Sequence, residues 1–401
     1  MSPSSFQDKN IVVGVTGGIA AYKVCQLVSS LKKQGAGVDV IMTQNATRFV
    51  APLTFQTLSS RPVVLNAFDA PQFWEVKHVA LAKKADLMIV APATANIIAK
   101  MANGIADDML STVLLATRAP ILIAPAMNTG MWDNPATKEN IATLQKRGYH
   151  FVGPERGLLA CGDAGKGRMS EPDDILQKAE QLLTVQDMKG LKVLVTAGAA
   201  RETVDPVRYI TNRSTGKMGY ALARAAYLRG AEVTLVSGQT ALQKPPVRVE
   251  PFHGTHDLLS LMQELAPKND IVIQAAAPAD FTVAEQSPEK IKKEGRDSLS
   301  LKLMAAPDVA QAIGKAKRPN QVFVGFAAET GDGTKSAQEK LDKKNLDFIM
   351  LNDITKQGAG FGADTNIVTY IDRQVREDWP LSSKREIADK IFTRALKKLK
   401  R

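Results

Sequence analysis

Two segments of this chain open in the same way, with an apolar strand that runs into a glycine turn and then a helix. Residues 11–20 read Ile-Val-Val-Gly-Val-Thr-Gly-Gly-Ile-Ala, and residues 191–198 read Leu-Lys-Val-Leu-Val-Thr-Ala-Gly. In such a turn, backbone N–H groups and the helix dipole can meet a nucleotide phosphate. The sequence therefore predicts two nucleotide-type sites, and the side chains around each turn decide its chemistry.

Apolar runs alternate with amphipathic segments throughout both halves, which is typical of parallel, doubly wound sheets. Strands are expected at 10–16, 38–43, 86–91, 120–125, 149–153, 191–196, 232–237, 270–276, 321–327 and 347–351, and antiparallel additions at 298–304 and 366–371. Helices are expected at 19–34, 111–117, 136–147, 172–183, 216–229, 255–266, 334–345 and 382–399. A length of 401 residues favours two domains over one core. We expect α/β domains over residues 1–184 and 191–401, joined by a linker at 185–190.

Composition limits the possible locations and partners. Two cysteines cannot form a disulfide framework, and no stretch has the length and apolarity of a membrane span or the pattern of a signal peptide. We therefore expect a cytoplasmic protein with no membrane partner. The excess of 52 basic over 41 acidic residues favours anionic ligands. Part of it lies in residues 384–401, where Ile387, Ile391, Ala395 and Leu399 recur at helical spacing. This pattern favours a docked terminal helix over a nucleic-acid-binding arm.

Small polar residues follow the expected strands of the first half. Gly17, Gly18 and Ile19 follow the first strand, Thr43 the second, residues 92–96 the third and residues 125–128 the fourth. Ligands of a doubly wound sheet bind outside these carboxyl ends. The chain lacks a Walker lysine and the Gly-x-Gly-x-x-Gly spacing of a dinucleotide site at this turn. The pattern indicates a mononucleotide cofactor with one phosphate at a helix N-terminus.

Three more residues of this half are candidates for chemistry, each with a simpler alternative. His78 begins a helical run, where the dipole favours the neutral ring, although it could be a surface histidine. Asn128 could serve a ligand or cap the next helix. Cys161 lies in a glycine-rich stretch at 157–169, which is typical of a flexible flap that delivers a proton to a sequestered substrate. Cys25 falls on an apolar helical face with Ala21, Val24 and Val28, and is expected in the core.

These motifs together resemble the flavin-dependent cysteine decarboxylase family. The resemblance rests on His78, Pro125-Ala126-Met127-Asn128, Ala160-Cys161-Gly162-Asp163 and Gly167-Arg168-Met169. It implies a flavodoxin-like fold that binds FMN and assembles as trimers or dodecamers. It also implies that the flavin oxidises a cysteine thiol to a thioaldehyde, carbon dioxide leaves, and the enethiolate is reduced and protonated. His78 would act as acid, base or orienting group, Asn128 would hold the carboxylate or amide, and Cys161 would donate the last proton. Flavin contacts are implied at Gly17, Gly18, Ile19, Ala20, Thr43, Ala93, Thr94, Ala95, Asn96 and Met127.

The second half carries a different set of motifs. A polar turn at 211–219 enters a helix and would suit an anion, but its Gly-Lys pair lacks the spacing of a P-loop. Asp280 follows an expected strand, and residues 287–293 hold three lysines in a short loop. On charge alone this loop, like Lys340 and Lys344, could simply be solvated.

Residues 191–401 resemble the phosphopantothenate–cysteine ligase family. The resemblance rests on segments 205–210, 216–219, 288–292 and 325–330 with Asn212, and the fusion of both halves is similar to bacterial bifunctional enzymes of coenzyme A biosynthesis. It implies that CTP with Mg²⁺ activates 4′-phosphopantothenate as an acyl-cytidylate, and that cysteine displaces CMP. Lys290 would stabilise the α-phosphate and Asn212 the acyl group. Nucleotide contacts are implied at Asp280, Lys290, Ala306, Pro307, Asp308, Val309, Phe326, Lys340 and Lys344. Ala199, Ala200 and Pro278 depart from the family pattern beside these loops.

Three other functions fit less well. A nicotinamide dehydrogenase needs a dinucleotide fingerprint that neither opening supplies. A flavin-binding regulatory protein would not need His78, Asn128 and Cys161 together, and would leave the second half unexplained. A nucleic-acid-binding protein rests on net charge alone. We therefore expect a homo-oligomeric enzyme, with trimer contacts in its first half and dimer contacts in its second.

Overall fold

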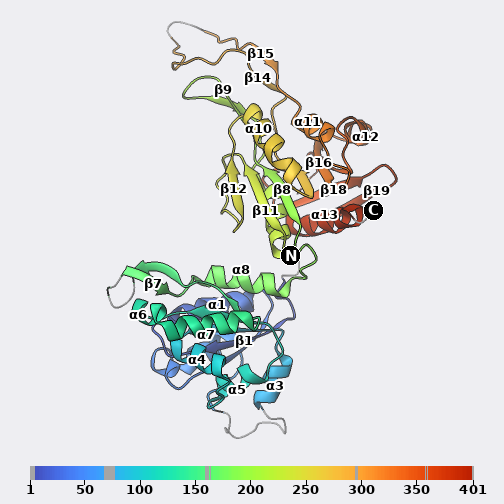
Figure 1. Cartoon of the computed structure of the whole chain (residues 1–401). Coiled ribbons are helices and arrows are strands. Elements are labelled where there is room, and N and C mark those ends of the chain that lie inside the picture. The colour runs from blue at the N-terminus through green and yellow to red at the C-terminus, as the bar shows by residue number, and fades with distance from the viewer. Residues whose placement is uncertain are drawn as a thin grey trace. The chain divides into compact units, whose positions relative to one another are not determined.

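The computed structural model describes residues 5–66, 77–158, 162, 164–293, 297–356, 358 and 360–399. The chain divides into two compact units, one ending at Val185 and the other beginning at Gln186 (Figure 1). Each unit is described by itself. Within the described part of the chain, no helix combines the length and apolarity that a membrane crossing requires.

The N-terminal unit contains a parallel sheet of five strands in the order β2-β1-β3-β4-β5. These strands are β1 (Asn10–Val15), β2 (Gly37–Met42), β3 (Leu87–Ala93), β4 (Ile121–Pro125) and β5 (His150–Phe151). The helices are α1 (Ala21–Lys33), α2 (Pro52–Ser59), α3 (Lys77–Lys84), α4 (Ala95–Asn103), α5 (Met109–Ala116), α6 (Thr129–Asp133), α7 (Pro135–Lys146) and α8 (Pro172–Leu183), with a 3₁₀ turn at Ala46–Arg48. This strand order is the flavodoxin-like order, which the resemblance implied.

Alternation along the strands divides the core of this unit into two layers. Ile11, Val13 and Val15 of β1 pack with α1, α2 and α8, whereas Val12 packs with α4, α5 and α7. Successive side chains of a strand point to opposite faces, so a strand covered on both faces is apolar throughout. Cys25 lies half-buried against the first of these layers, as expected for a core residue.

The C-terminal unit contains an eight-stranded sheet in the order β12-β11-β8-β13-β16-β17-β18-β19. Its strands are β8 (Lys192–Ala197), β11 (Glu232–Ser237), β12 (Arg248–Pro251), β13 (Ile271–Gln274), β16 (Val322–Glu329), β17 (Phe348–Asp353), β18 (Thr365–Ile371) and β19 (Arg376–Ser383). The first six are parallel and follow the Rossmann order, and β18 and β19 add antiparallel strands at one edge. The prediction of two doubly wound α/β folds is confirmed.

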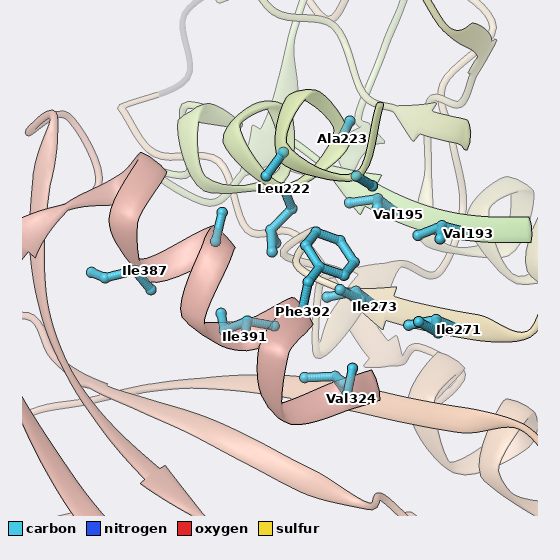
Figure 2. Close-up of a cluster of buried hydrophobic side chains, with 14 of the residues drawn as sticks. Val193, Val195, Leu222, Ala223, Ile271, Ile273, Val324, Ile387, Ile391 and Phe392 are labelled. Carbon is cyan, nitrogen blue, oxygen red and sulfur yellow. The ribbon is translucent and has the colours of Figure 1, made fainter. Parts of the chain in front are cut away.

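Helices cover both faces of this second sheet. They are α9 (Lys217–Leu228), α10 (Thr255–Leu265), α11 (Val309–Lys315), α12 (Thr334–Lys343) and α13 (Lys384–Leu399), with a 3₁₀ turn at Ala266–Lys268. Figure 2 shows Phe392 of α13 beside Leu222 of α9 and Ile273 of β13. Ile387, Ile391 and Ala395 are fully buried in the same layer, so the terminal helix docks by its apolar stripe as predicted.

Short hairpins lie outside the main sheets, and of the strands given below only β15 overlaps a predicted one. These hairpins are β6 (Glu155–Leu158) with β7 (Ala164–Arg168), β9 (Arg201–Thr203) with β10 (Tyr209–Thr211), and β14 (Phe281–Val283) with β15 (Leu303–Ala305). Strands β12 and β19 and helices α2, α4, α6 and α11 were likewise not predicted from the sequence patterns. The strand expected at 298–304 is restricted to β15, because β14 offers it only three partners. In Figure 1 the β14–β15 hairpin extends beyond the sheet of its unit.

The β18–β19 hairpin carries a buried carboxylate that makes stability depend on pH. Asp372 accepts hydrogen bonds from the hydroxyl of Tyr370, the ammonium of Lys398 and the N–H groups of Gln374 and Val375. Burial alone would raise the pKa of Asp372, but these donors lower it from 3.8 to about 2. Because the folded pKa lies below the unfolded one, the stabilisation is present above about pH 4 and is lost as the pH falls toward 2.

We expect Asp372→Asn to lower the free energy of unfolding by about 2 kcal/mol at pH 7. The difference from the wild type should shrink by about half at pH 3, where the unfolded carboxyl is mostly protonated. Guanidinium denaturation of both proteins at the two pH values measures it. A deficit that is the same at both values would show that the charge of Asp372 is not its cause.

Candidate active sites

A cavity of about 650 Å³ lies in the N-terminal unit, where loops follow β1, β3 and β4. This volume is in the range of cofactor and ligand sites. The cavity also lies at the point where the strand order reverses between β1 and β3, the usual ligand position in an open α/β sheet. Its lining comes from the turn 17–20, from Tyr22 and Lys23 of α1, from Thr94 and Ala95, from residues 126–128 with Met131, and from Leu158 and residues 167–169.

Two glycines of this lining have no room for a side chain. A Cβ on Gly17 would lie 2.5 Å from Cβ of Asn45, and a Cβ on Gly167 would lie 2.2 Å from the carbonyl oxygen of Met127. Gly167 also has φ +152°, which favours glycine, and its carbonyl accepts the N–H of Met127 at 3.0 Å. Strand β7 therefore packs directly against the segment that leads to Asn128.

Hydrogen bonds fix the two polar loops of the cavity. The Thr16 hydroxyl donates to the carbonyl of Pro92 at 2.6 Å and accepts the N–H of Thr94 at 3.2 Å. Oδ1 of Asn128 accepts the N–H of Gly130 at 2.7 Å and so caps α6. The capping alternative for Asn128 is thus present, and the same side chain also lines the cavity.

Two cations that line the cavity share one carboxylate partner. Nζ of Lys23 is 2.8 Å from Glu171, which also pairs with Arg168, and both cations line the cavity. The hydrogen bond from Lys23, with further help from Arg168, lowers the pKa of Glu171 below its usual value. Glu171 therefore stays ionised and balances one of the two positive charges.

In the C-terminal unit, the loop after β13 is held at its switch point beside β8. Nδ2 of Asn212 donates to the carbonyl of Pro278 at 2.9 Å, and the N–H of Ala306 donates to the carbonyl of Asp280 at 2.9 Å. Nearby, Lys344 pairs with Asp308 at 3.1 Å, and Asp308 caps α11. The structure therefore brings four of the predicted nucleotide residues, Asp280, Ala306, Asp308 and Lys344, into two contacting pairs.

The lysine loop is attached to the β9–β10 hairpin. Oδ2 of Asp205 accepts the N–H of Ile291 at 3.1 Å, and the guanidinium of Arg208 donates to the Ile291 carbonyl at 3.2 Å. Burial would raise the pKa of Asp205, but the N–H groups of Val207, Ile291 and Arg208 and the charge of Arg208 hold it below its usual value. The backbone is thus fixed next to Lys290, whose side chain is exposed.

Comparison with known proteins assigns both halves of the chain to known families. The family described as Flavoprotein matches residues 2–184, and the family described as DNA/pantothenate metabolism flavoprotein C-terminal domain matches residues 188–399. The coenzyme A biosynthesis bifunctional protein CoaBC of Bacillus subtilis (strain 168) is 48% identical over 392 residues, which cover 96% of each chain. This chain belongs to the family of coenzyme A biosynthesis bifunctional proteins.

Another member of the family, CoaBC of Escherichia coli (strain K12), is 42% identical over 403 residues, which cover 97% of this chain and 98% of that one. A crystal structure of the C-terminal domain of a CoaBC is 37% identical, covers 53% of this chain and 98% of that chain, and has a TM-score of 0.46. The expectation of a bifunctional enzyme of coenzyme A biosynthesis, with a decarboxylase and a ligase half, is confirmed.

Most of the predicted flavin contacts gather in this family member's N-terminal cavity. Those that line it are Gly17, Gly18, Ile19, Ala20, Thr94, Ala95 and Met127. The described lining does not include the other three predicted contacts, Thr43, Ala93 and Asn96, and Ala93 is buried in β3. His78 is the second residue of α3, which packs against α5, and it too lies outside that lining. Cys161 lies outside the described residues.

Three of the predicted nucleotide residues are buried or paired with another side chain, and so are less available to contact a ligand. Val309 is fully buried, Phe326 is partly buried against the core, and Lys340 pairs with Glu329 at 2.6 Å. Pro307 lies in the loop between β15 and α11, close to Asp308. Of the family departures, Ala199 and Ala200 are buried, and the N–H of Ala200 donates to the carbonyl of Ala277.

Several lining residues were not chosen from the sequence, above all Met131 and Leu158. Met131 lies in α6, three residues after Asn128, and only its proximity to that residue could have indicated it. Asp205 and Arg208 belonged to a recognised motif, but their contact with the lysine loop, more than 80 positions away, has no local signal.

Proposed function

We propose that the two units of this enzyme catalyse consecutive reactions. The C-terminal unit activates 4′-phosphopantothenate with Mg²⁺ and CTP as an acyl-cytidylate with release of pyrophosphate, and cysteine then displaces CMP to form the amide. The N-terminal unit uses FMN to release the cysteine carboxyl group as carbon dioxide, which leaves 4′-phosphopantetheine. The observation that carries the proposal is the cavity built by Gly17–Ala20, Thr94 and Met127–Asn128 in the half that matches the flavoprotein family.

The residues around that cavity fit a flavin mononucleotide. The turn 17–20 precedes α1, whose N-cap residue Ala20 provides no side-chain cap, so a phosphate can serve as acceptor at this terminus. Lys23 and Arg168 add positive charge there, and the remaining lining is mostly apolar, as a ring system requires. Bound FMN supplies the electron sink without which the carboxylate could not leave.

Three side chains act on the substrate in this half. Asn128, held at the cavity wall by its bond to Gly130, holds the substrate carboxylate or amide. Cys161 donates the last proton from the segment between β6 and β7, and His78 acts as acid, base or orienting group. His78 lies on α3 and outside the described cavity lining, and in the proposed homo-oligomer a second copy of the chain would bring it to the cavity.

The C-terminal unit provides cations where phosphate charge develops. Lys290 stabilises the α-phosphate as the carboxylate attacks it, and Mg²⁺ binds the triphosphate oxygens. Asn212 holds the acyl group, at a position fixed by its bond to Pro278. Asp280, Phe326, Lys340 and Lys344, with the segment 306–309, contact the cytidine nucleotide.

We also propose a homo-oligomer. Ile19, Tyr22 and Leu158 line the N-terminal cavity yet are 58%, 60% and 72% exposed, so they offer apolar surface to the proposed trimer contacts, which could extend to a dodecamer. Phe281 and Met304 of the β14–β15 hairpin are 57% and 53% exposed, so they offer apolar surface to the proposed dimer contacts of the other half. The small number of cysteines supports a cytoplasmic location, and the ligands are small molecules rather than nucleic acid.

An assay of the whole protein tests the proposal. The yellow, flavin-loaded protein is incubated with 4′-phosphopantothenate, cysteine, CTP and Mg²⁺, and the products are separated. We expect pyrophosphate, CMP, carbon dioxide and 4′-phosphopantetheine, and no amide when CTP is left out. Absence of 4′-phosphopantetheine from the products of the complete mixture would contradict the proposal.

A further inference from the structure

Glu202 is a buried carboxylate that no step of the proposed reactions uses. It lies in β9 and is 4% exposed. Its Oε1 accepts both the N–H of Thr255 at 2.9 Å and the Thr255 hydroxyl at 2.8 Å. Its Oε2 accepts the hydroxyl of Thr282 at 2.6 Å. One carboxylate thus joins three separate elements, β9, the first turn of α10, and β14.

These bonds reach both sides of Asp280. On the C-terminal side, Glu202 binds Thr282 directly. On the N-terminal side, it acts through Thr255, whose hydroxyl donates to Glu202 and accepts the N–H of Ala279 at 3.0 Å. The segment 279–282 is therefore held at its two ends by the same side chain. The side chain of Asp280, between these ends, is exposed to solvent.

The protonation state of Glu202 suits this arrangement. Burial raises the pKa of a carboxyl group, but the hydroxyl of Thr282 and the N–H and hydroxyl of Thr255 hold the pKa of Glu202 below its usual value. The carboxylate stays ionised near neutral pH and accepts at both oxygens. An ionised acceptor makes stronger hydrogen bonds than a neutral one, so the segment is held firmly.

We propose that Glu202 is a positioning residue for nucleotide binding, which fixes the segment 279–282 so that Asp280 meets the cytidine nucleotide. The inference rests on the proposed CTP-dependent ligation. Glu202 itself touches no substrate, and its effect passes through Thr255 and Thr282. Glu202 thus orders the loop of the proposed nucleotide site before CTP binds.

The test compares three variants of the full chain. Glu202→Ala removes both arms, Glu202→Gln keeps a carbonyl acceptor for Thr255, and Thr282→Val removes the direct arm. Asp372→Asn is the matched control, because Asp372 is also a buried carboxylate with several donors in the same unit but lies on the β18–β19 hairpin. CTP affinity is measured by calorimetry, and KM for CTP and for cysteine by pyrophosphate release and amide formation.

We expect Glu202→Ala to raise Kd and KM for CTP by about tenfold or more, because all three hydrogen bonds that Glu202 accepts are lost. KM for cysteine, and decarboxylation of added 4′-phosphopantothenoylcysteine, should remain at the wild-type value. Glu202→Gln should raise KM for CTP by only about two- to threefold. Thr282→Val should add little to Glu202→Ala, because both changes break the same contact.

Two results would overturn the inference alone. One is an unchanged affinity for CTP in Glu202→Ala. If the alanine variant does not fold, an unchanged affinity in both single variants, Glu202→Gln and Thr282→Val, has the same meaning. The other is a rise in KM for CTP that is as large in the control Asp372→Asn as in Glu202→Ala, because loss of a buried carboxylate anywhere in the unit would then explain it. A wild-type protein that neither binds CTP nor forms the amide would instead overturn the proposed function, and the inference with it.

Discussion

Lys290→Gln is expected to slow formation of the acyl-cytidylate by about a hundred- to a thousandfold, the usual cost of removing one group that stabilises charge in a transition state. Negative charge grows on the α-phosphate oxygens as the carboxylate attacks, and the Lys290 ammonium is proposed to meet it. The neighbouring Ile291 is held by Asp205 and Arg208, so the loop needs little rearrangement to present this side chain. Pyrophosphate release with CTP and 4′-phosphopantothenate, in the absence of cysteine, measures this step alone.

Lys293→Gln is the matched control for this prediction. Lys293 lies in the same loop, is exposed, and loses the same charge on substitution. It should release pyrophosphate at a rate within about twofold of the wild type, because a screened surface charge contributes little. Decarboxylation of added 4′-phosphopantothenoylcysteine should be unaffected in both variants. Equal slowing by the two substitutions would mean that the loop acts by net charge rather than through Lys290.

Cys161→Ser is expected to abolish formation of 4′-phosphopantetheine while carbon dioxide is still released. The thiol is proposed to supply the last proton, which is needed only after decarboxylation, so the variant should stop at the oxidised, decarboxylated enethiol. A serine hydroxyl is a much weaker acid than a thiol and cannot replace it. Mass spectrometry should find a product two hydrogen atoms lighter than 4′-phosphopantetheine, and the flavin should stay reduced until oxygen reoxidises it.

The other cysteine of the chain provides the control. Cys25 lies in α1, half-buried against the core, and burial raises the pKa of its thiol. Cys25→Ser should therefore still give 4′-phosphopantetheine as the final product. Full conversion by Cys161→Ser would contradict the role assigned to Cys161. Loss of product in Cys25→Ser would show that the essential thiol is not Cys161 alone.

Local patterns were sufficient for most strands of the two sheets, except the edge strands β12 and β19, and for much of the first site. Continuous apolar strands such as β1 are buried on both faces, and their carboxyl ends bring Gly17, Thr94 and Met127 to one cavity. The terminal helix followed from the spacing of Ile387, Ile391 and Ala395. These features depend on periods of two or 3.6 residues, which the sequence displays directly.

Long-range contacts account for the hairpins that could not be predicted. The β9–β10 and β14–β15 hairpins are stabilised by contacts such as Glu202 with Thr282 and Asp205 with Ile291, which join residues about 80 positions apart. No short window of sequence contains both partners. The position of His78 on α3, outside the described cavity lining, likewise depends on tertiary packing.

The central claim is that the amide made by the C-terminal unit is the compound that the N-terminal unit decarboxylates. Cysteine labelled with ¹³C at its carboxyl carbon tests this claim most directly. With 4′-phosphopantothenate, CTP and Mg²⁺, the wild-type protein should release labelled carbon dioxide in an amount equal to the CMP formed, and none when CTP or 4′-phosphopantothenate is omitted. Labelled carbon dioxide without CTP, or CMP and amide without labelled carbon dioxide, would contradict the account.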